Sequence, residues 1–180
     1  VDNFRPGVMG KMGFSYKRLQ ELKPDVVYCG ITGFGATGPY KDRPAFDFII
    51  QAMSGFMSLN NKEGAEPMRV APPISDLIAG LYGAFGIVAA LYNRVQTGKG
   101  QEVQTSLLDG MISMLGFMGT NFFATDKLPV RTGNDHPIVA PYGLFKAKDG
   151  NLAIAPSNEQ VYQKFLVALG LTHLNDDPDF

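Results

Sequence analysis

An apolar segment from Asp76 to about Gln96 limits the fold more than any other part of this sequence. It begins with an aspartate, a residue type that caps helices, and ends with Arg94 followed by Thr97-Gly98, so it predicts one long helix. Each glycine inside a helix costs about 0.5–1 kcal/mol relative to alanine, which is tolerated where other backbone must approach closely. We therefore expect tight packing on several sides of this helix, because small residues cover more than one face: Ala79, Gly80, Gly83, Ala84, Gly86, Ala89 and Ala90.

Shorter elements surround this helix in an order typical of an α/β fold. Ser15 is placed to cap a helix over Tyr16–Leu22, and the β-branched run after it predicts a buried strand that ends at Thr32. Alternation of polar and apolar residues over Gln101–Leu107 predicts a second strand. The other expected elements are helices over 8–12, 46–57, 109–124 and 160–169, and a hairpin of strands 143–147 and 151–155 that turns at Asp149-Gly150.

The composition excludes several classes of protein. A chain of 180 residues with 45% hydrophobic residues has enough apolar material for a sizeable core, which excludes a disordered protein. The net charge of -1 argues against a nucleic-acid partner, because such proteins need a basic surface. The single cysteine, Cys29, excludes an internal disulfide and a cysteine-built metal site, so no metal is expected.

The sequence predicts neither a membrane span nor a leader peptide. The longest apolar stretch, Leu77–Tyr92, is interrupted by glycines and is shorter than the roughly 20 residues that a span needs. The chain opens on Val1 rather than on methionine, and no basic and apolar leader follows. We therefore expect a fragment of a longer protein, with a cytoplasmic location.

The loop Gly33–Gly38 matches the glycine spacing of dinucleotide-binding proteins but lacks their context. Pro39 follows the third glycine, so no helix can begin there cleanly, and Ser58 stands where an acidic residue would bind the ribose. A flexible glycine loop is the better interpretation.

Asp76 and His136 each have a structural and a functional interpretation. A carboxylate at a helix start is most simply a cap, but ionised and facing a pocket it can also be a nucleophile. Asp47 and Asp109 fit the role of caps for their own helices. His136 lies in a loop that is either an exposed turn or a substrate contact. Lys11, Lys41 and Arg43 could contact phosphates, but scattered basic residues usually belong to a solvated surface.

Several segments together resemble the class III CoA-transferases, the family that includes formyl-CoA transferase, carnitine CoA-transferase and α-methylacyl-CoA racemase. Any one segment is weak, but their joint occurrence in this order along nearly the whole chain is specific. They are Asp2–Gly7, Lys11–Gly13, Gly33–Tyr40, Phe46–Gly55, Asp76 with Gly80, Gly86–Leu91 and Thr97–Gln101.

The resemblance implies an α/β fold with a Rossmann-like large domain and a smaller domain, in an interlocked homodimer. Residues 1–125 would belong to the large CoA-binding domain and residues 126–180 to the smaller α+β domain. It also implies that Asp76 attacks an acyl-CoA thioester, forming an aspartyl mixed anhydride and then an aspartyl-CoA thioester. The implied site residues are the coenzyme A contacts Asn3, Phe4, Arg5, Lys11 and Met12, and the substrate loop Gly133, Asn134 and His136.

Two alternatives to a transferase stay open. Racemases of the family carry a catalytic histidine just before the aspartate matched by Asp47, but this sequence has Phe46 there, which disfavours a second acid or base. A non-catalytic CoA-binding fragment is the other alternative. The resemblance implies no tightly bound cofactor, with an acyl-CoA and a carboxylic acid as substrates, and it leaves open which acids these are.

Overall fold

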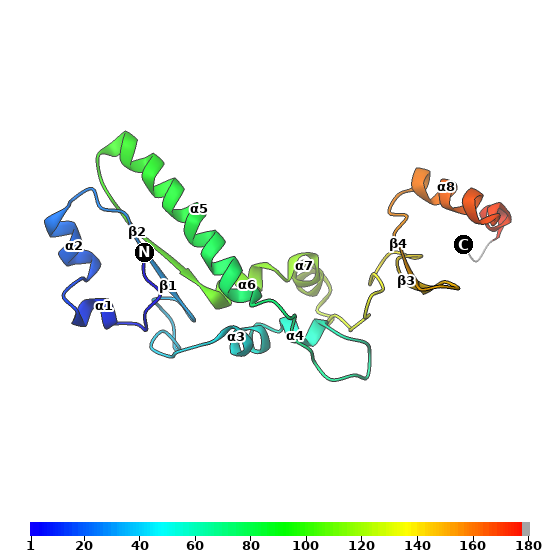
Figure 1. Ribbon diagram of the computed structural model, residues 1–180, viewed down its shortest axis with the longest axis horizontal. Coiled ribbons are helices and arrows are strands. Elements are labelled where there is room, and N and C mark those ends of the chain that lie inside the picture. The colour runs from blue at the N-terminus through cyan, green and yellow to red at the C-terminus, as the bar shows by residue number, and fades with distance from the viewer. Residues whose placement is uncertain (178–180) are drawn as a thin grey trace. The chain divides into compact units, whose positions relative to one another are not determined.

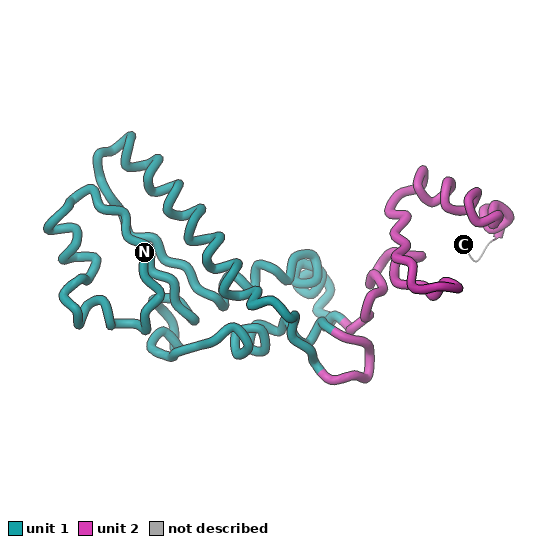
Figure 2. Tube along the Cα trace, viewed as in Figure 1, with its two compact units in different colours: residues 1–60, 67–129 teal, residues 61–66, 130–180 magenta. Residues whose placement is uncertain are grey.

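The computed structural model describes residues 1–177 and divides the chain into two units, each with its own internal contacts (Figure 2). The first unit comprises residues 1–60 and 67–129, and the second comprises residues 61–66 and 130–180. The division after Pro129 lies four residues beyond the boundary drawn from the sequence, and the segment 61–66 belongs to the second unit rather than the first. Both units mix helices and strands, as the α/β expectation requires.

The first unit is built on two parallel strands, β1 (Tyr28–Thr32) and β2 (Glu102–Ser106). They pair in register from Tyr28 opposite Glu102 to Thr32 opposite Ser106. Asp2 forms a parallel bridge to Gly30 on β1, so the N-terminal residues lie beside this strand. The carboxyl ends of both strands meet at one edge, which is where ligands bind in parallel α/β sheets. A Rossmann-like arrangement needs further strands, so that part of the expectation stays a prediction.

The long helix α5 (Ile74–Thr97) lies against the sheet, as Figure 1 shows. Glycines allow this approach, as expected: a Cβ on Gly83 would lie 3.3 Å from the Ile31 side chain, and one on Gly86 would lie 2.4 Å from Val103. The expectation of packing on several sides is wrong for the residues that the structure describes, because the outer face of α5 is exposed. Gly98 ends the helix in the left-handed conformation, as predicted.

The core of the first unit lies where α5 meets two shorter helices, α3 (Asp47–Met53) and α6 (Leu107–Ser113). Each helix contributes buried apolar side chains, and they form one cluster: Ile50, Ala79, Leu107 and Met111. Burying each of the three larger side chains, Ile50, Leu107 and Met111, contributes about 1.5–3 kcal/mol. This cluster therefore fixes the beginning of α5 relative to α3.

Two helices expected as continuous are broken in the structure. The segment 46–57 forms α3 and then α4 (Phe56–Leu59), separated by Gly55 with φ of 82°. The segment 109–124 forms α6 and α7 (Gly116–Thr125), whose axes differ by 73°. Gly116 has φ of 54°, a conformation that interrupts a right-handed helix.

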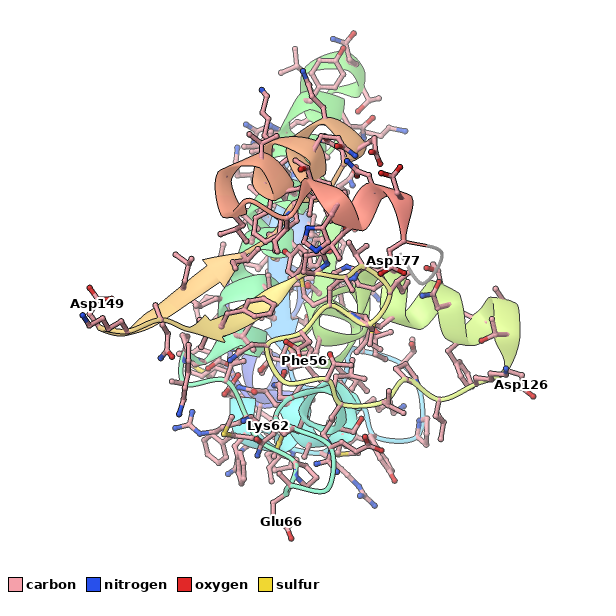
Figure 3. All side chains as sticks on the ribbon, turned by 90° about the vertical axis from the view of Figure 1, so that its right-hand side faces the viewer. Phe56, Lys62, Glu66, Asp126, Asp149 and Asp177 are labelled. Atoms are coloured by element: carbon pink, nitrogen blue, oxygen red, sulfur yellow. The ribbon has the colours of Figure 1, made fainter. Side chains whose placement is uncertain are left out.

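The remaining elements follow the sequence closely. In the first unit these are α1 (Val8–Lys11) and α2 (Tyr16–Leu22), and Ser15 caps α2 by accepting a hydrogen bond from the Arg18 N–H. In the second unit, β3 (Gly143–Lys146) and β4 (Asn151–Ile154) form the predicted hairpin, and Figure 3 shows Asp149 at its tip. Helix α8 (Glu159–Leu169) and a 3₁₀ helix over Thr172–Asp176 complete this unit.

Helix α5 is longer than the apolar stretch counted from the sequence. It has 24 residues and a mean hydropathy of 1.8 in its most apolar part, so by length and composition alone it could cross a membrane. Helices α6 and α7 pass the same test only if they are counted as one bent span. The argument from length against a span is therefore wrong, although the core helices of soluble proteins also pass this test.

Candidate active site

A cleft of about 300 Å³ at the carboxyl end of β1 brings Asp76 together with the N-terminal segment. We call it the Asp76 cleft, and all of its lining residues belong to the first unit. Three of the five predicted coenzyme A contacts are among them. The lining residues are Asn3, Phe4, Arg5, Pro6, Ile31, Thr32, Gly33, Arg43, Pro44, Ala45, Phe46, Asp76 and Leu107.

The carboxylate of Asp76 is not used as a helix cap. Helix α5 begins at Ile74, two residues before Asp76, after Pro73, whose side chain cannot cap it. Among the residues that the structure describes, none donates a hydrogen bond to the Asp76 carboxylate. The purely structural interpretation of this residue is therefore wrong, and its carboxylate is available at the wall of the cleft.

Asp47 supplies the cap that Asp76 does not. Its Oδ1 accepts hydrogen bonds from both the backbone N–H and the hydroxyl of Ser75, each 2.9 Å long. Its Oδ2 accepts a 2.8 Å bond from Gln51 Nε2, and Gln51 Oε1 in turn accepts one from the Val70 N–H. Ser75 and Gln51 are fully buried. Asp47, expected to cap its own helix, instead holds the start of α5 and so fixes the position of Asp76.

The surroundings of Asp76 make its carboxyl a weaker acid. Partial burial is the larger cause, and the negative charge of Asp47 is the second; both raise the pKa of Asp76 above the ordinary value of 3.8. A raised pKa makes the ionised carboxylate a stronger base. Such a carboxylate, without a hydrogen-bond donor in the described residues and open to a cleft, is suited to nucleophilic attack.

A second cleft of about 380 Å³ adjoins the first, and we call it the N-terminal cleft. Phe4, Arg5, Pro6 and Thr32 line both clefts, so the two clefts are neighbours along the N-terminal segment. Residues of both charges line it. They are Arg5 and Lys41 on the one hand, and Asp2, Asp42 and Glu102 on the other.

Hydrogen bonds to β1 fix the N-terminal segment that the two clefts share. Asn3 donates its side-chain amide to the Ile31 carbonyl over 2.8 Å, so this donor already has a structural partner. Asp2 accepts hydrogen bonds from the Phe4 N–H and from the Tyr28 hydroxyl. Burial, followed by the contact with Asp2, raises the pKa of Tyr28. Phe4 and Arg5 are thus held in place beside the cleft.

The other predicted contacts lie outside the Asp76 cleft. Lys11 ends α1 and Met12 follows it, and neither residue lines the Asp76 cleft or the N-terminal cleft. Gly133, Asn134 and His136 belong to the second unit, where Gly133 has φ of 67°. The Nδ1 atom of His136 accepts hydrogen bonds from the Ile138 and Val139 N–H groups.

The described residues 1–177 contain no group of three or more side chains suited to a metal ion. Cys29 is buried, and burial raises the pKa of its thiol. The glycine loop after β1 continues as turns, and no helix begins at Gly38; the next helix, α3, begins only at Asp47. The dinucleotide interpretation therefore fails, as expected.

Sequence reasoning missed two residues of this region. Asp47 acts on Ser75 across 28 positions, a pairing that no local pattern announces, although its spacing of four from Gln51 fits the bond between them. Arg43, expected to belong to a solvated surface, lines the Asp76 cleft.

Comparison with known proteins decides the family, because the model of CoA-transferase family III matches residues 1–180. The chain belongs to CoA-transferase family III. This confirms the resemblance drawn from the sequence. Among curated relatives of the family, the acetyl-CoA:oxalate CoA-transferase of Acetobacter aceti is 39% identical over 181 residues, covering 100% of this chain and 46% of its own length. The succinate–glutarate CoA-transferase of Agrobacterium fabrum is 36% identical, covering 98% and 44%.

A solved structure of the family has the same fold. A CAIB/BAIF family protein from Brucella suis superposes with a TM-score of 0.84 at 39% identity, covering 99% of this chain and 47% of that one. The chain thus spans less than half the length of the family members that it matches.

Proposed function

We propose that the complete protein is a CoA-transferase that moves coenzyme A from an acyl-CoA to a carboxylic acid, with Asp76 as its nucleophile. The observation that carries this proposal is the Asp76 carboxylate: it lines a cleft with Phe4 and Arg5 and has no hydrogen-bond donor among the described residues. Membership of CoA-transferase family III and the transferase names of the relatives support it.

The first half of the reaction transfers coenzyme A to the protein. A carboxylate oxygen of Asp76 attacks the thioester carbonyl, the C–S bond breaks, and coenzyme A leaves as its thiolate while a mixed anhydride forms. The thiolate then attacks the aspartyl carbonyl and releases the donor acid as a carboxylate. The product is an aspartyl-CoA thioester. Dividing the exchange into such steps replaces one difficult transfer by feasible ones.

The second half reverses these steps with a different acid. The acceptor carboxylate attacks the aspartyl-CoA carbonyl, which expels the thiolate and forms a new mixed anhydride. The thiolate attacks the acceptor's acyl carbon, and Asp76 leaves again as a carboxylate. The raised pKa of Asp76 supports its own attack on the donor thioester in the first half, because a more basic carboxylate is a better nucleophile.

The two adjoining clefts support a path for the coenzyme. Phe4 and Arg5 border both, so the pantetheine chain would pass them on its way from the N-terminal cleft to Asp76. Arg5 and Lys41 would offset phosphate charge in the N-terminal cleft, through charge-assisted contacts. Lys11 and Met12 remain candidate contacts for the outer part of the coenzyme, and Gly133, Asn134 and His136 remain the candidate substrate loop.

Three features of the whole protein complete the proposal. We infer a homodimer, interlocked as in the family, because the outer face of α5 carries exposed apolar residues. We also infer a cytoplasmic location and no tightly bound cofactor. Racemase chemistry is disfavoured, because Phe46 in the Asp76 cleft cannot act as the second acid or base.

Asp76→Asn in the complete protein tests the proposal, since asparagine keeps the shape of the side chain and removes the nucleophile. With succinyl-CoA as donor and labelled glutarate or oxalate as acceptor, we expect transfer to fall by at least about a thousandfold. The wild-type protein should also form a hydroxylamine-sensitive adduct on Asp76, visible by mass spectrometry. Transfer that survives the substitution would exclude Asp76 as nucleophile.

Two other outcomes of the same assay would favour the alternatives. Deuterium entering the α-carbon of an acyl-CoA without transfer would indicate a racemase. Coenzyme A binding without any turnover would indicate a non-catalytic module.

A further inference from the structure

Arg43 is the cationic side chain confined to the Asp76 cleft. It lines this cleft but not the N-terminal cleft, whereas Arg5 lines both. Lys41, two residues earlier, lines the N-terminal cleft but not the Asp76 cleft. The three cations are therefore divided between the proposed path of the coenzyme and the place where the acids react.

The guanidinium of Arg43 is held by an aromatic ring rather than by a carboxylate. Its Cζ atom lies 4.1 Å from the centre of the Tyr40 ring, within the range of a cation–π contact. The Arg43 N–H also donates to the Tyr40 carbonyl over 2.9 Å, which closes the turn between the two residues. Within residues 1–177, no carboxylate lies within ion-pair distance of Arg43.

An oriented guanidinium without an anionic partner is well suited to bind a carboxylate from solution. Arginine stays protonated at any working pH, and its planar donors match both oxygens of a carboxylate. Asp76 lines the cleft, and the negative charge of Asp47 acts on it from nearby, so a cation in the cleft favours entry of an anionic substrate.

We propose that Arg43 binds the second, unreacting carboxylate of a dicarboxylic acid, so that Asp76 exchanges coenzyme A between dicarboxylates. This inference rests on the proposed function and adds the substrate class to it. One carboxylate of the acid must reach the acyl carbon on Asp76, and the other then needs a partner in the same cleft. Tyr40 acts on this contact indirectly, as the residue that positions the guanidinium.

The test compares acids of equal length with and without the second carboxylate, using the complete protein with succinyl-CoA as donor. The acceptor pairs are glutarate with pentanoate, and succinate with butanoate. We expect the wild-type protein to use glutarate at least about tenfold more efficiently than pentanoate, since a bidentate contact between arginine and a carboxylate is a strong, charge-assisted one. Arg43→Gln should raise KM for glutarate at least tenfold, leave kcat within about twofold, and leave kcat/KM for pentanoate nearly unchanged.

Arg18→Gln is the matched control, because Arg18 is an exposed residue of α2 that pairs with Glu21 and lines neither cleft. It should change neither acid's kinetics. Tyr40→Leu should weaken glutarate use in the same sense as Arg43→Gln, but less, because the guanidinium remains and loses only its support.

Calorimetry of glutarate and pentanoate binding to protein saturated with coenzyme A gives a readout that does not need turnover. Binding of glutarate that depends on Arg43, without any transfer, would support the carboxylate site and contradict the proposed reaction. Transfer at equal efficiency to glutarate and pentanoate would overturn the inference while leaving the reaction intact. An equal loss for both acids in Arg43→Gln would also overturn it.

Discussion

At the scale of single residues, two neighbouring carboxylates have different roles in the site. Asp47 accepts three hydrogen bonds and holds the start of α5, while Asp76 accepts none from the described residues and faces the cleft. Two anions close together repel, and acylation of Asp76 removes one of the charges. The repulsion therefore favours the acylated form of the protein over the free carboxylate.

Asp47→Asn should move the acid limb of the pH profile to lower pH. The reactive form of Asp76 is the ionised one, and its raised pKa places the loss of kcat/KM at a higher pH than an ordinary aspartate would. Removing the charge of Asp47 lowers the pKa of Asp76, so more of the protein stays ionised in acid. The shift should be partial, because burial is the larger cause and remains.

The measurement is kcat/KM from about pH 4 to pH 8 for the complete protein. The substituted asparagine can still accept from Ser75 through its side-chain carbonyl oxygen, but its amide nitrogen cannot accept the bond that Gln51 donates to Asp47. The free energy of unfolding of the variant is therefore measured alongside the pH profile. Asp149→Asn, at the exposed tip of the β3–β4 hairpin, is the matched control for loss of one carboxylate (Figure 3). If the acid limb of the kcat/KM profile of Asp47→Asn lies at the same pH as in the wild-type protein, or at a higher pH, the coupling of Asp47 to Asp76 is contradicted.

At the scale of helices and strands, capping residues in the sequence predict where a helix begins or ends better than the sequence predicts whether a helix is unbroken. Ser15 and Gly170 mark the start of α2 and the end of α8 because each makes a local cap, and both ends agree with the structure. The break between α6 and α7 depends on Gly116 adopting positive φ, which the sequence permits but does not require. The sequence could place Asp76 at the start of a helix, but not show that Asp47 would cap that helix from α3.

Gly86→Ala should destabilise the protein by about 1–3 kcal/mol, because its Cβ would lie 2.4 Å from the Val103 side chain and push α5 off the sheet. Gly80→Ala on the same helix is the control: a Cβ there meets no described atom within 4 Å, so it should stabilise by up to about 1 kcal/mol. Val103→Ala combined with Gly86→Ala should recover part of the loss. Urea denaturation of these three variants and of Val103→Ala alone measures this coupling, and strictly additive effects would show that the two residues do not clash.

At the scale of the whole molecule, the outer face of α5 poses the main question. Five of its exposed apolar residues follow the alternating spacing of four and three that marks a helix face packed against a partner. They are Leu81, Phe85, Val88, Tyr92 and Val95. The chain spans less than half the length of its relatives, and we expect either further chain or a second copy to cover these residues.

Lipid is the other apolar environment that could cover this face, and the inner face of α5 argues against it. Gly83 and Gly86 hold the helix against β1 and β2, so a span formed by α5 would take the sheet with it. Parallel strands in hydrocarbon would leave backbone groups at the sheet edge without partners, each at a cost of several kcal/mol. We therefore expect the complete protein to partition into the aqueous phase on detergent phase separation and to be a dimer by light scattering.

Val88→Asp tests whether protein covers the outer face of α5 in the complete protein. Val88 is 65% exposed in the described chain, so a carboxylate there is harmless unless another part of the complete protein covers it. If protein covers it, the buried charge should lower the free energy of unfolding by more than about 2 kcal/mol or convert the dimer to a monomer. Gln96→Glu adds a negative charge at an exposed polar position of the same helix and should do neither. Wild-type protein in the detergent phase would instead show that α5 enters lipid, and an unaffected dimer in Val88→Asp would leave the outer face of α5 outside the interface.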